Sequence, residues 1–438
     1  MNPKTPIQLF LLLWSACFLF YFGVCIWVFR TRPLKRWSEI AIILGGTVLF
    51  HALLLPLLPG LSRDAWRYLW DGKVIAHGYS PYLYAPVDKL FLPLRDNVYV
   101  QALYRDFTTK YPPGIELVYL LGYWLTPNNL FGMKLLFITC DVVTCIALII
   151  YLMRLGNDPR RVILYAWCPL PIVEFALEGH GEAVTIICIV LASLCARSSR
   201  QRWRFLAGIF LGIATLCKLY PIILLLAIVR KRDWGLVFAC FITIILGYLP
   251  FLSLSHWHIS GVVFSFVGQA EEHRGVLQNV LRLVGYAFNI PLPITITVIT
   301  LSELALMLTA ILAVVLRRQI GTEAAILLLL TTVLIVYANV FPWYATVLLP
   351  WIALLIEPLW GAKGLNARGI VIALVWYFTF VVIASYIPGL RPYNKTVNWL
   401  IYYGISFGVM LIGLGLAAAI YLWPRLVPSI DALKAKKA

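Results

Sequence analysis

Residues 7–29 read IQLFLLLWSACFLFYFGVCIWVF, a run without a charged side chain that is long enough to cross a bilayer as a helix. Similar apolar runs fall near residues 38–58, 130–152, 162–178, 183–196, 235–252, 294–316, 322–340, 345–357, 369–388 and 397–423, with shorter ones at 115–127 and within 205–229. Of the 438 residues, 62% are hydrophobic and 13% are charged, with a mean hydropathy of +0.87. In soluble domains about 45–50% of the residues are hydrophobic and about 25% are charged. The sequence therefore predicts an all-α polytopic membrane protein of about 11–14 transmembrane or re-entrant helices, and excludes soluble enzymes and nucleic-acid binders.

Basic clusters between these runs predict the orientation of the chain. Lys and Arg number 36 against 19 Asp and Glu, and basic residues collect in the cytoplasmic loops of membrane proteins. This rule predicts extracytoplasmic loops at 59–113 and 253–293, and a cytoplasmic tail at 424–438. Residues 1–423 then form one transmembrane domain, whose first run is too long for a signal-peptide core. All nine cysteines lie in apolar stretches without metal-binding spacing, so no metal site is predicted.

The stretch 205–229 begins and ends at basic clusters but is too short for two crossings. We expect two half-helices that meet at Lys218-Leu-Tyr-Pro221, because Pro221 lacks a backbone donor. Broken backbone at this depth is tolerated only against protein or a wet cavity. The Lys218 ammonium there requires an anion, either a lipid phosphate or a structural partner such as Asp141. The run 115–127 is expected to be a partial helix.

The first outer loop opens with a helical stretch from Asp64 that we expect to stop at Gly72. Four of its polar side chains are spaced at i, i+3, i+4 and i+7 and so share one face: Asp64, Arg67, Tyr68 and Asp71. Two carboxylates with an arginine between them suit acid–base chemistry. The alternative is a solvated interfacial helix held by an Asp–Arg pair.

Two further groups are candidates for substrate binding. Glu174, Glu178 and Glu182 surround His180 and could bind a cation or sugar hydroxyls, although water-exposed helix ends explain them almost as well. Phe341-Pro-Trp-Tyr344 breaks a helix and offers aromatic surfaces, and an interfacial aromatic belt is the alternative explanation.

Together these motifs resemble a known family. Asp64-Ala-Trp-Arg-Tyr-Leu-Trp-Asp-Gly-Lys73, followed by His77-Gly-Tyr-Ser-Pro-Tyr82, is similar to the first-loop signature of bacterial GT-C glycosyltransferases. The closer resemblance is to polyprenyl-phosphate-mannose-dependent mannosyltransferase-like proteins. Tyr111-Pro-Pro-Gly114, the Lys218 motif and the Phe341 motif follow in the expected order, so the resemblance covers about residues 40–360.

The resemblance implies an inverting transfer of a hexose, most simply mannose, from a polyprenyl-phosphate-linked donor. The acceptor is a lipid, a glycan or a protein on the extracytoplasmic face of the bacterial inner membrane. Asp64 matches the catalytic base, Asp71 the second acid that orients sugar or acceptor, and Lys218 the group that holds the donor phosphate. The other candidate substrate-binding residues are Arg67, Tyr68, Tyr111, His180, Glu182, Trp343 and Tyr344. No cofactor is expected, with a divalent cation as the alternative.

Two other classes of protein fit parts of the pattern. A transporter or flippase of a lipid-linked or small substrate also has broken helices and buried charges, but usually has internal repeats, which this sequence lacks. A non-catalytic membrane scaffold does not need Lys218 or the clustered acids of the first loop. Turnover of a lipid-linked sugar separates the transferase from both.

Overall fold

The computed structural model describes residues 7–33, 35–255, 281, 285, 288–316, 320–336, 340–361, 364–389 and 408–421. Over these ranges the regular secondary structure is helical apart from one antiparallel pair of two-residue strands, β1 (Trp360–Gly361) and β2 (Gly364–Leu365). Six helical segments in the described part are long and apolar enough to cross a membrane: Leu9–Arg30, Arg36–Leu54, Phe131–Arg154, Trp234–Leu254, Pro293–Val315 and Ala367–Tyr386. The protein is thus an all-α polytopic membrane protein, as its composition predicts.

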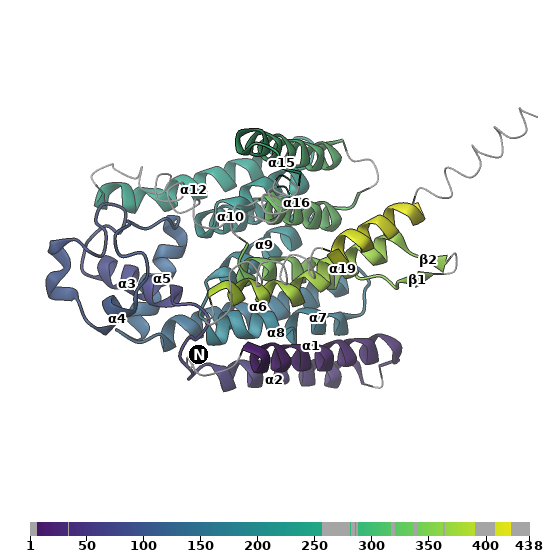
Figure 1. Cartoon of the computed structure of the whole chain (residues 1–438), viewed down its shortest axis with the longest axis horizontal. Helices are drawn as coiled ribbons and strands as arrows, with labels where there is room; N and C mark the ends of the chain where they lie inside the picture. The colour runs from purple at the N-terminus through teal and green to yellow at the C-terminus, as the bar shows by residue number, and fades with distance from the viewer. Residues whose placement is uncertain are drawn as a thin grey trace, which may run out of the picture.

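The helices run side by side in a bundle, and a small helical module closes one of its ends (Figure 1). The bundle contains α1 (Ile7–Arg30), α2 (Arg36–Leu54), α6 (Phe131–Arg154), α9 (Glu182–Ala196), α10 (Gln201–Cys217), α12 (Trp234–Leu254), α15 (Leu292–Val315), α16 (Thr322–Val336), α19 (Ala367–Val381) and the helix Gly408–Tyr421. The module contains α3 (Asp64–Ala76), η1 (Lys89–Leu94), α4 (Asn97–Gln101) and α5 (Pro113–Leu125). Within it α3 packs on α5, and α5 contacts α6 and α10 of the bundle.

Burial separates an inner helix from helices that face outward. α9 is buried along nearly its whole length and packs against α6 and α10. The outer helices instead expose large apolar side chains, such as Leu19 at 71% and Phe238 at 63%. Continuous apolar exposure of this kind is unfavourable in water and is what a lipid-facing surface requires.

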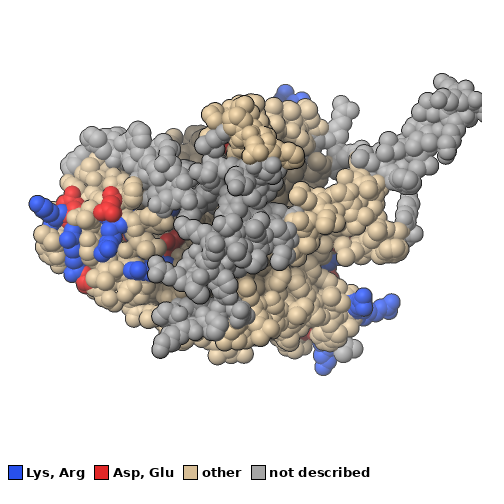
Figure 2. Space-filling model, viewed as in Figure 1, with Lys and Arg blue, Asp and Glu red and all other residues tan. Residues whose placement is uncertain are grey.

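Charged groups gather at the ends of the bundle. Side chains of both signs cover the α3–α5 end (Figure 2). At the opposite end Arg160 bonds to Glu39 and to the carbonyl of Thr31, and Arg197 pairs with Glu323. Arg160 and Arg197, which belong to two of the basic clusters in the sequence, therefore lie away from the first loop. Which end faces the cytoplasm remains a prediction of the charge rule.

Two runs expected as single spans are interrupted. The run 162–178 consists of η2 (Pro159–Val162), α7 (Ile163–Ala166), α8 (Pro169–Pro171) and a π-helix, η3 (Ile172–Leu177). The run 345–357 follows α17 (Pro342–Ala345) and divides into η5 (Thr346–Leu348) and α18 (Leu349–Leu355). Prolines cause these breaks because they lack a donor and clash with the preceding turn. The broken backbone is tolerated because almost all of these residues are buried in protein.

The other expected breaks are found, with one exception. α10 ends at Cys217, and η4 (Tyr220–Leu224) and α11 (Leu225–Ile228) follow, which confirms the interruption at Lys218. α5 is a short helix, as predicted for 115–127. The expectation that α3 stops at Gly72 is wrong, because α3 continues to Ala76. Gly72 instead allows close packing, since a Cβ there would lie 2.3 Å from the carbonyl oxygen of Tyr119 in α5.

Parts of the predicted organisation lie outside the described residues. These are most of the second outer loop, 253–293, part of the run 397–423 and the tail 424–438. η6 (Val382–Gly389) continues α19 toward the α3–α5 end.

The contact at Gly72 gives a test of the module's packing. We expect Gly72→Ala to separate α3 from α5 and to lower the free energy of unfolding by about 1–3 kcal/mol, the usual cost of overpacking. Thermal unfolding of the detergent-solubilised protein measures the loss. Gly45→Ala in α2 is the matched control, because a Cβ at Gly45 meets nothing within 4 Å. Equal melting temperatures for the two variants would contradict the proposed contact.

Candidate active site

The polar face of α3 lines a cavity of about 300 Å³. All four residues that helical spacing places together reach it, which confirms the predicted face. The cavity is lined by Asp64, Arg67, Tyr68, Asp71, Tyr104, Thr108, Thr109, Lys110 and Tyr111. Asp64 is the first residue of α3, where the helix N-terminus favours a negative charge. With the described residues its carboxylate makes no hydrogen bond and no ion pair, so it is available to a bound molecule.

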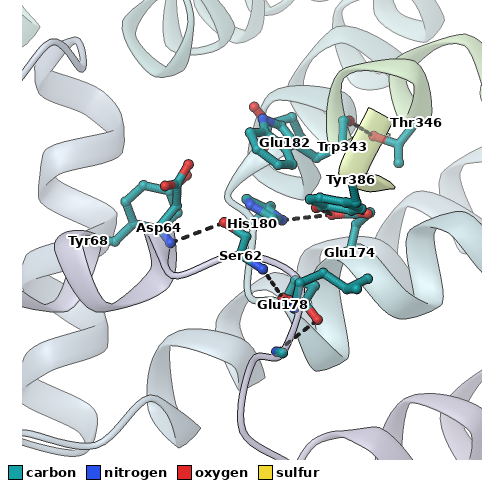
Figure 3. A network of polar contacts seen from close by, with 12 residues as sticks. Ser62, Asp64, Tyr68, Glu174, Glu178, His180, Glu182, Trp343, Thr346 and Tyr386 are labelled. Atoms are coloured by element: carbon teal, nitrogen blue, oxygen red, sulfur yellow. Dashed lines mark hydrogen bonds and ion pairs between the residues drawn. The ribbon is translucent and has the colours of Figure 1, made fainter. Parts of the chain in front are cut away.

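A buried carboxylate fixes the segment that leads into Asp64. Glu178 accepts hydrogen bonds from the backbone N–H groups of Gly60 (3.2 Å), Leu61 (3.0 Å) and Ser62 (2.8 Å). The Ser62 hydroxyl then accepts the N–H of Asp64 at 3.2 Å (Figure 3). Glu178 is completely buried, and hydrogen bonds to a charged acceptor are stronger than neutral ones. It therefore acts on the position of Asp64 and does not face the cavity.

Arg67 and Asp71 form a buried pair on the floor of the cavity. The Nε of Arg67 donates to both carboxylate oxygens of Asp71, at 2.9 and 3.0 Å. Its other nitrogens donate to the carbonyls of Tyr104 and Phe107 in the loop. Burial raises the pKa of Asp71, and the Arg67 guanidinium opposes part of that shift. The pair ties the loop to α3, so Asp71 reaches a ligand with its charge already partly balanced.

Aromatic rings separate this cavity from the bundle. The Tyr111 hydroxyl donates to that of Tyr68 at 3.2 Å, and the Tyr68 ring stacks on Tyr119 with centroids 4.5 Å apart. Tyr111 also contributes to a second cavity, so its ring lies at the boundary of the two spaces.

The second cavity, of about 600 Å³, lies beside the break after α10. It is lined by Lys110, Tyr111, Pro112, Lys218, Leu219, Tyr220, Val333, Leu334 and Tyr344. Lys218 lies over the rings of Tyr111 and Tyr344, 4.9 and 5.1 Å from their centroids. Its ammonium pairs with Glu182 at 2.8 Å, and the Glu182 side chain is 1% exposed. Two predicted residues from separate helices are thereby joined.

This pairing corrects one expectation for Lys218. The structural partner is Glu182 and not Asp141, whose carboxylate instead contacts His51 at 3.2 Å and accepts the Tyr165 hydroxyl at 2.5 Å. Asp141 is buried in the bundle on α6, as expected for an ionisable residue in a span.

His180 lies on a backbone bend that begins at Gly179, whose φ is +73°. Its Nδ1 is 2.8 Å from Glu174, which also accepts the Tyr386 hydroxyl at 3.1 Å (Figure 3). Its ring stacks on Trp343 at 3.8 Å. Burial opposes protonation, but the carboxylates of Glu174, Asp64 and Glu182 outweigh it and raise the pKa of His180.

Trp343 has a different surrounding from the one its motif predicts. Besides His180, it stacks on Phe341 with centroids 4.5 Å apart, and it is 4% exposed. Its ring faces are covered, so it offers little surface to a sugar and instead holds His180 in place. Tyr344 keeps one side toward the second cavity, near Lys218.

The three glutamates of this region do not converge. Glu174 contacts His180, Glu178 binds the backbone before α3, and Glu182 pairs with Lys218. In the described ranges, no group of three or more His, Cys, Asp or Glu side chains is placed to hold a metal ion. A cation held by this trio is therefore not the arrangement found.

The ten predicted site residues form one connected cluster, although their roles stay predictions. Sequence reasoning missed Lys110, which lines both cavities, and Tyr386, which bonds to Glu174. It also missed Thr109 and Glu116, which lie near Asp71 and are linked by a 2.6 Å hydrogen bond from the Thr109 hydroxyl to the Glu116 carboxylate. Lys110 precedes Tyr111-Pro-Pro-Gly114, which reads in the sequence as an ordinary helix start. No local pattern distinguishes the others.

A carboxylate-bearing polar cavity thus adjoins a lysine-bearing apolar one within a polytopic membrane protein. The family comparison gives the class of protein: residues 6–231, just over half of the chain, match the N-terminal domain of the alpha-(1->6)-mannopyranosyltransferases. The chain belongs to this family and is a mannosyltransferase. No curated protein sequence and no solved structure matches it.

The ion pair of Lys218 gives a test that separates folding from function. Lys218→Met leaves Glu182 buried and unpaired, which costs about 3–5 kcal/mol of stability. Because removing both charges is often neutral, we expect Lys218→Met with Glu182→Gln to melt near the wild-type temperature.

Donor binding is then measured on the stable double variant. A loss of binding there that Glu182→Gln alone does not show identifies Lys218 as a binding residue, whereas wild-type affinity would assign it to structure alone.

Proposed function

We propose that the protein transfers mannose from a polyprenyl-phosphate-linked donor to a hydroxyl of a lipid, glycan or protein acceptor. The reaction takes place on the extracytoplasmic face of the bacterial inner membrane, inverts the anomeric carbon and follows the GT-C pattern. One observation carries the proposal: a cavity with an unpaired carboxylate adjoins an apolar cavity with a lysine, and the two share Lys110 and Tyr111.

The larger cavity suits the donor. Leu219, Val333 and Leu334 supply an apolar lining for the first isoprene units, while Lys218 supplies a positive charge for the phosphate. A charged group near apolar surface matches a molecule with an anionic head and an apolar tail. The cavity of Asp64 then receives the acceptor, with its polar lining directed at sugar hydroxyls.

The reaction needs a base and positive charge beside the departing phosphate. The acceptor oxygen attacks the anomeric carbon of mannose as its proton passes to the Asp64 carboxylate. The bond between that carbon and the phosphate oxygen breaks, and its electron pair stays on the phosphate. Attack opposite to the departing phosphate inverts the configuration.

Phosphate is a good leaving group, and a positioned cation stabilises the charge that develops on it. Lys218 can supply part of this charge in place of a metal ion. A divalent cation is the alternative, and transfer in the presence and absence of EDTA distinguishes the two.

Asp64→Asn tests the base. We expect transfer to fall at least about 100-fold, because general base catalysis contributes about 10²–10⁴-fold, while donor binding is retained. Membranes with either form are incubated with radiolabelled polyprenyl-phosphate-mannose and extracted host glycolipids, and label leaving the donor is followed. Full activity of the variant would remove Asp64 as the base. If the wild-type protein binds the donor but transfers no label, the acceptor is a different molecule. If the wild-type protein does not bind the donor, a transporter is favoured.

The orientation of the site is tested by cysteine labelling in a Cys17→Ser background, because Cys17 is exposed. Asp106→Cys is exposed in the first loop, and Lys231→Cys is exposed at a basic cluster. We expect a membrane-impermeant maleimide to label position 106 in intact cells and position 231 only after permeabilisation. The reverse pattern would place the site on the cytoplasmic side.

A further inference from the structure

Lys110 lies at the junction of the two cavities. It is half-buried in the loop that precedes α5, and it contributes to the lining of both spaces. Its ammonium lies 5.4 Å from the ring centroid of Tyr104 and 5.8 Å from that of Tyr111. Lys218 lies over the same Tyr111 ring, so two ammonium groups flank one aromatic side chain.

The two lysines differ in how their charge is balanced. Lys218 pairs with Glu182 at 2.8 Å, which neutralises it before any ligand binds. Lys110 makes no ion pair and no hydrogen bond through its ammonium with the described residues. An unpaired ammonium in a half-buried site is unfavourable and is stabilised when an anion binds beside it.

The groups that face Lys110 come from three elements. Asp64 and Arg67 belong to α3, Glu182 begins α9, and Lys218 follows α10. Burial lowers the pKa of Lys110 to about 8; Asp64 opposes this shift, and the charge of Lys218 adds to it. At neutral pH the group is thus mostly charged.

We infer that Lys110 is a second phosphate-binding residue, which stabilises the polyprenyl phosphate leaving group at the boundary between donor and acceptor cavities. This inference rests on the proposed function. In this inference Lys110, whose ammonium has no ionic partner among the described residues, stabilises the negative charge that the reaction creates on the phosphate.

The charge change of the substrate explains why a second cation is needed. The donor phosphodiester carries one negative charge, and the departing polyprenyl phosphate gains a second when the sugar–oxygen bond breaks. Lys218 with Glu182 has no net charge, so the pair alone cannot balance that gain. Lys110 adds one positive charge where it develops, which stabilises the transition state more than the bound donor.

The test compares Lys110→Met, Lys110→Arg and Lys89→Met in purified full-length protein. Lys89 is exposed on η1 and lines neither cavity, so its variant is the matched control. Binding of undecaprenyl phosphate and of the uncharged alcohol undecaprenol is measured without turnover. For Lys110→Met we expect phosphate affinity to fall about tenfold or more, as for a lost charged hydrogen bond. Affinity for the alcohol should be unchanged, and Lys110→Arg and Lys89→Met should bind both as the wild type does.

The pH dependence gives a second readout. Wild-type affinity for undecaprenyl phosphate should weaken as the pH rises above about 8, because free Lys110 then loses its proton. Arginine stays charged at these pH values, so Lys110→Arg should retain its affinity.

The outcomes separate the inference from the function on which it rests. Equal loss of phosphate and alcohol binding in Lys110→Met, or no loss of either, overturns the role of Lys110 and leaves the proposed donor intact. If the wild type binds neither compound, the proposed donor class fails, and the role of Lys110 fails with it.

Discussion

Backbone groups that leave a helix inside apolar surroundings must find new partners, and this constraint organises the site. The chain is interrupted at Glu178–Gly181, after Cys217 and before Pro342. The second and third interruptions border the second cavity through Lys218, Leu219 and Tyr344, and His180 of the first stacks on Trp343 of the third. Glu178 satisfies the backbone donors of the neighbouring loop, and the break after Cys217 opens onto the second cavity, where Leu219 is 47% exposed. The polar side chains of the site therefore lie where the helices end, between segments that are otherwise apolar.

The charges of the site are balanced unevenly. Glu178 is occupied by backbone donors. Lys218 balances the carboxylate of Glu182, and His180 balances that of Glu174. Asp64 and Lys110, which face the cavities, are left without such partners in the described residues. A buried charge is costly unless paired, so unpaired groups are informative about what binds. One remaining negative and one remaining positive group fit a hydroxyl that loses a proton and a phosphate that gains charge.

The sequence predicts what depends on local geometry. Helical spacing placed Asp64 and Asp71 on one face, and Pro221 indicated the break at Lys218. It could not predict the partner of Lys218, because the approach of α9 to the end of α10 is set by packing between distant segments. The same limit applies to Gly72, whose role is visible only once α5 lies against it. Hydropathy also predicted one continuous helix over residues 162–178, where the structure has several short ones, because a buried, broken segment is as apolar as a membrane span.

The bonds between Glu178 and the loop before α3 also bear on how this region tolerates change. The three donors are main-chain N–H groups, which every amino acid except proline provides. Residues 60 and 61 can therefore vary in side chain without disturbing the contact, whereas Ser62 also accepts the N–H of Asp64 through its hydroxyl. Position 178 requires two acceptor oxygens at a fixed reach, so substitutions are tolerated less well at this glutamate than at residues 60 and 61 of the loop that it holds.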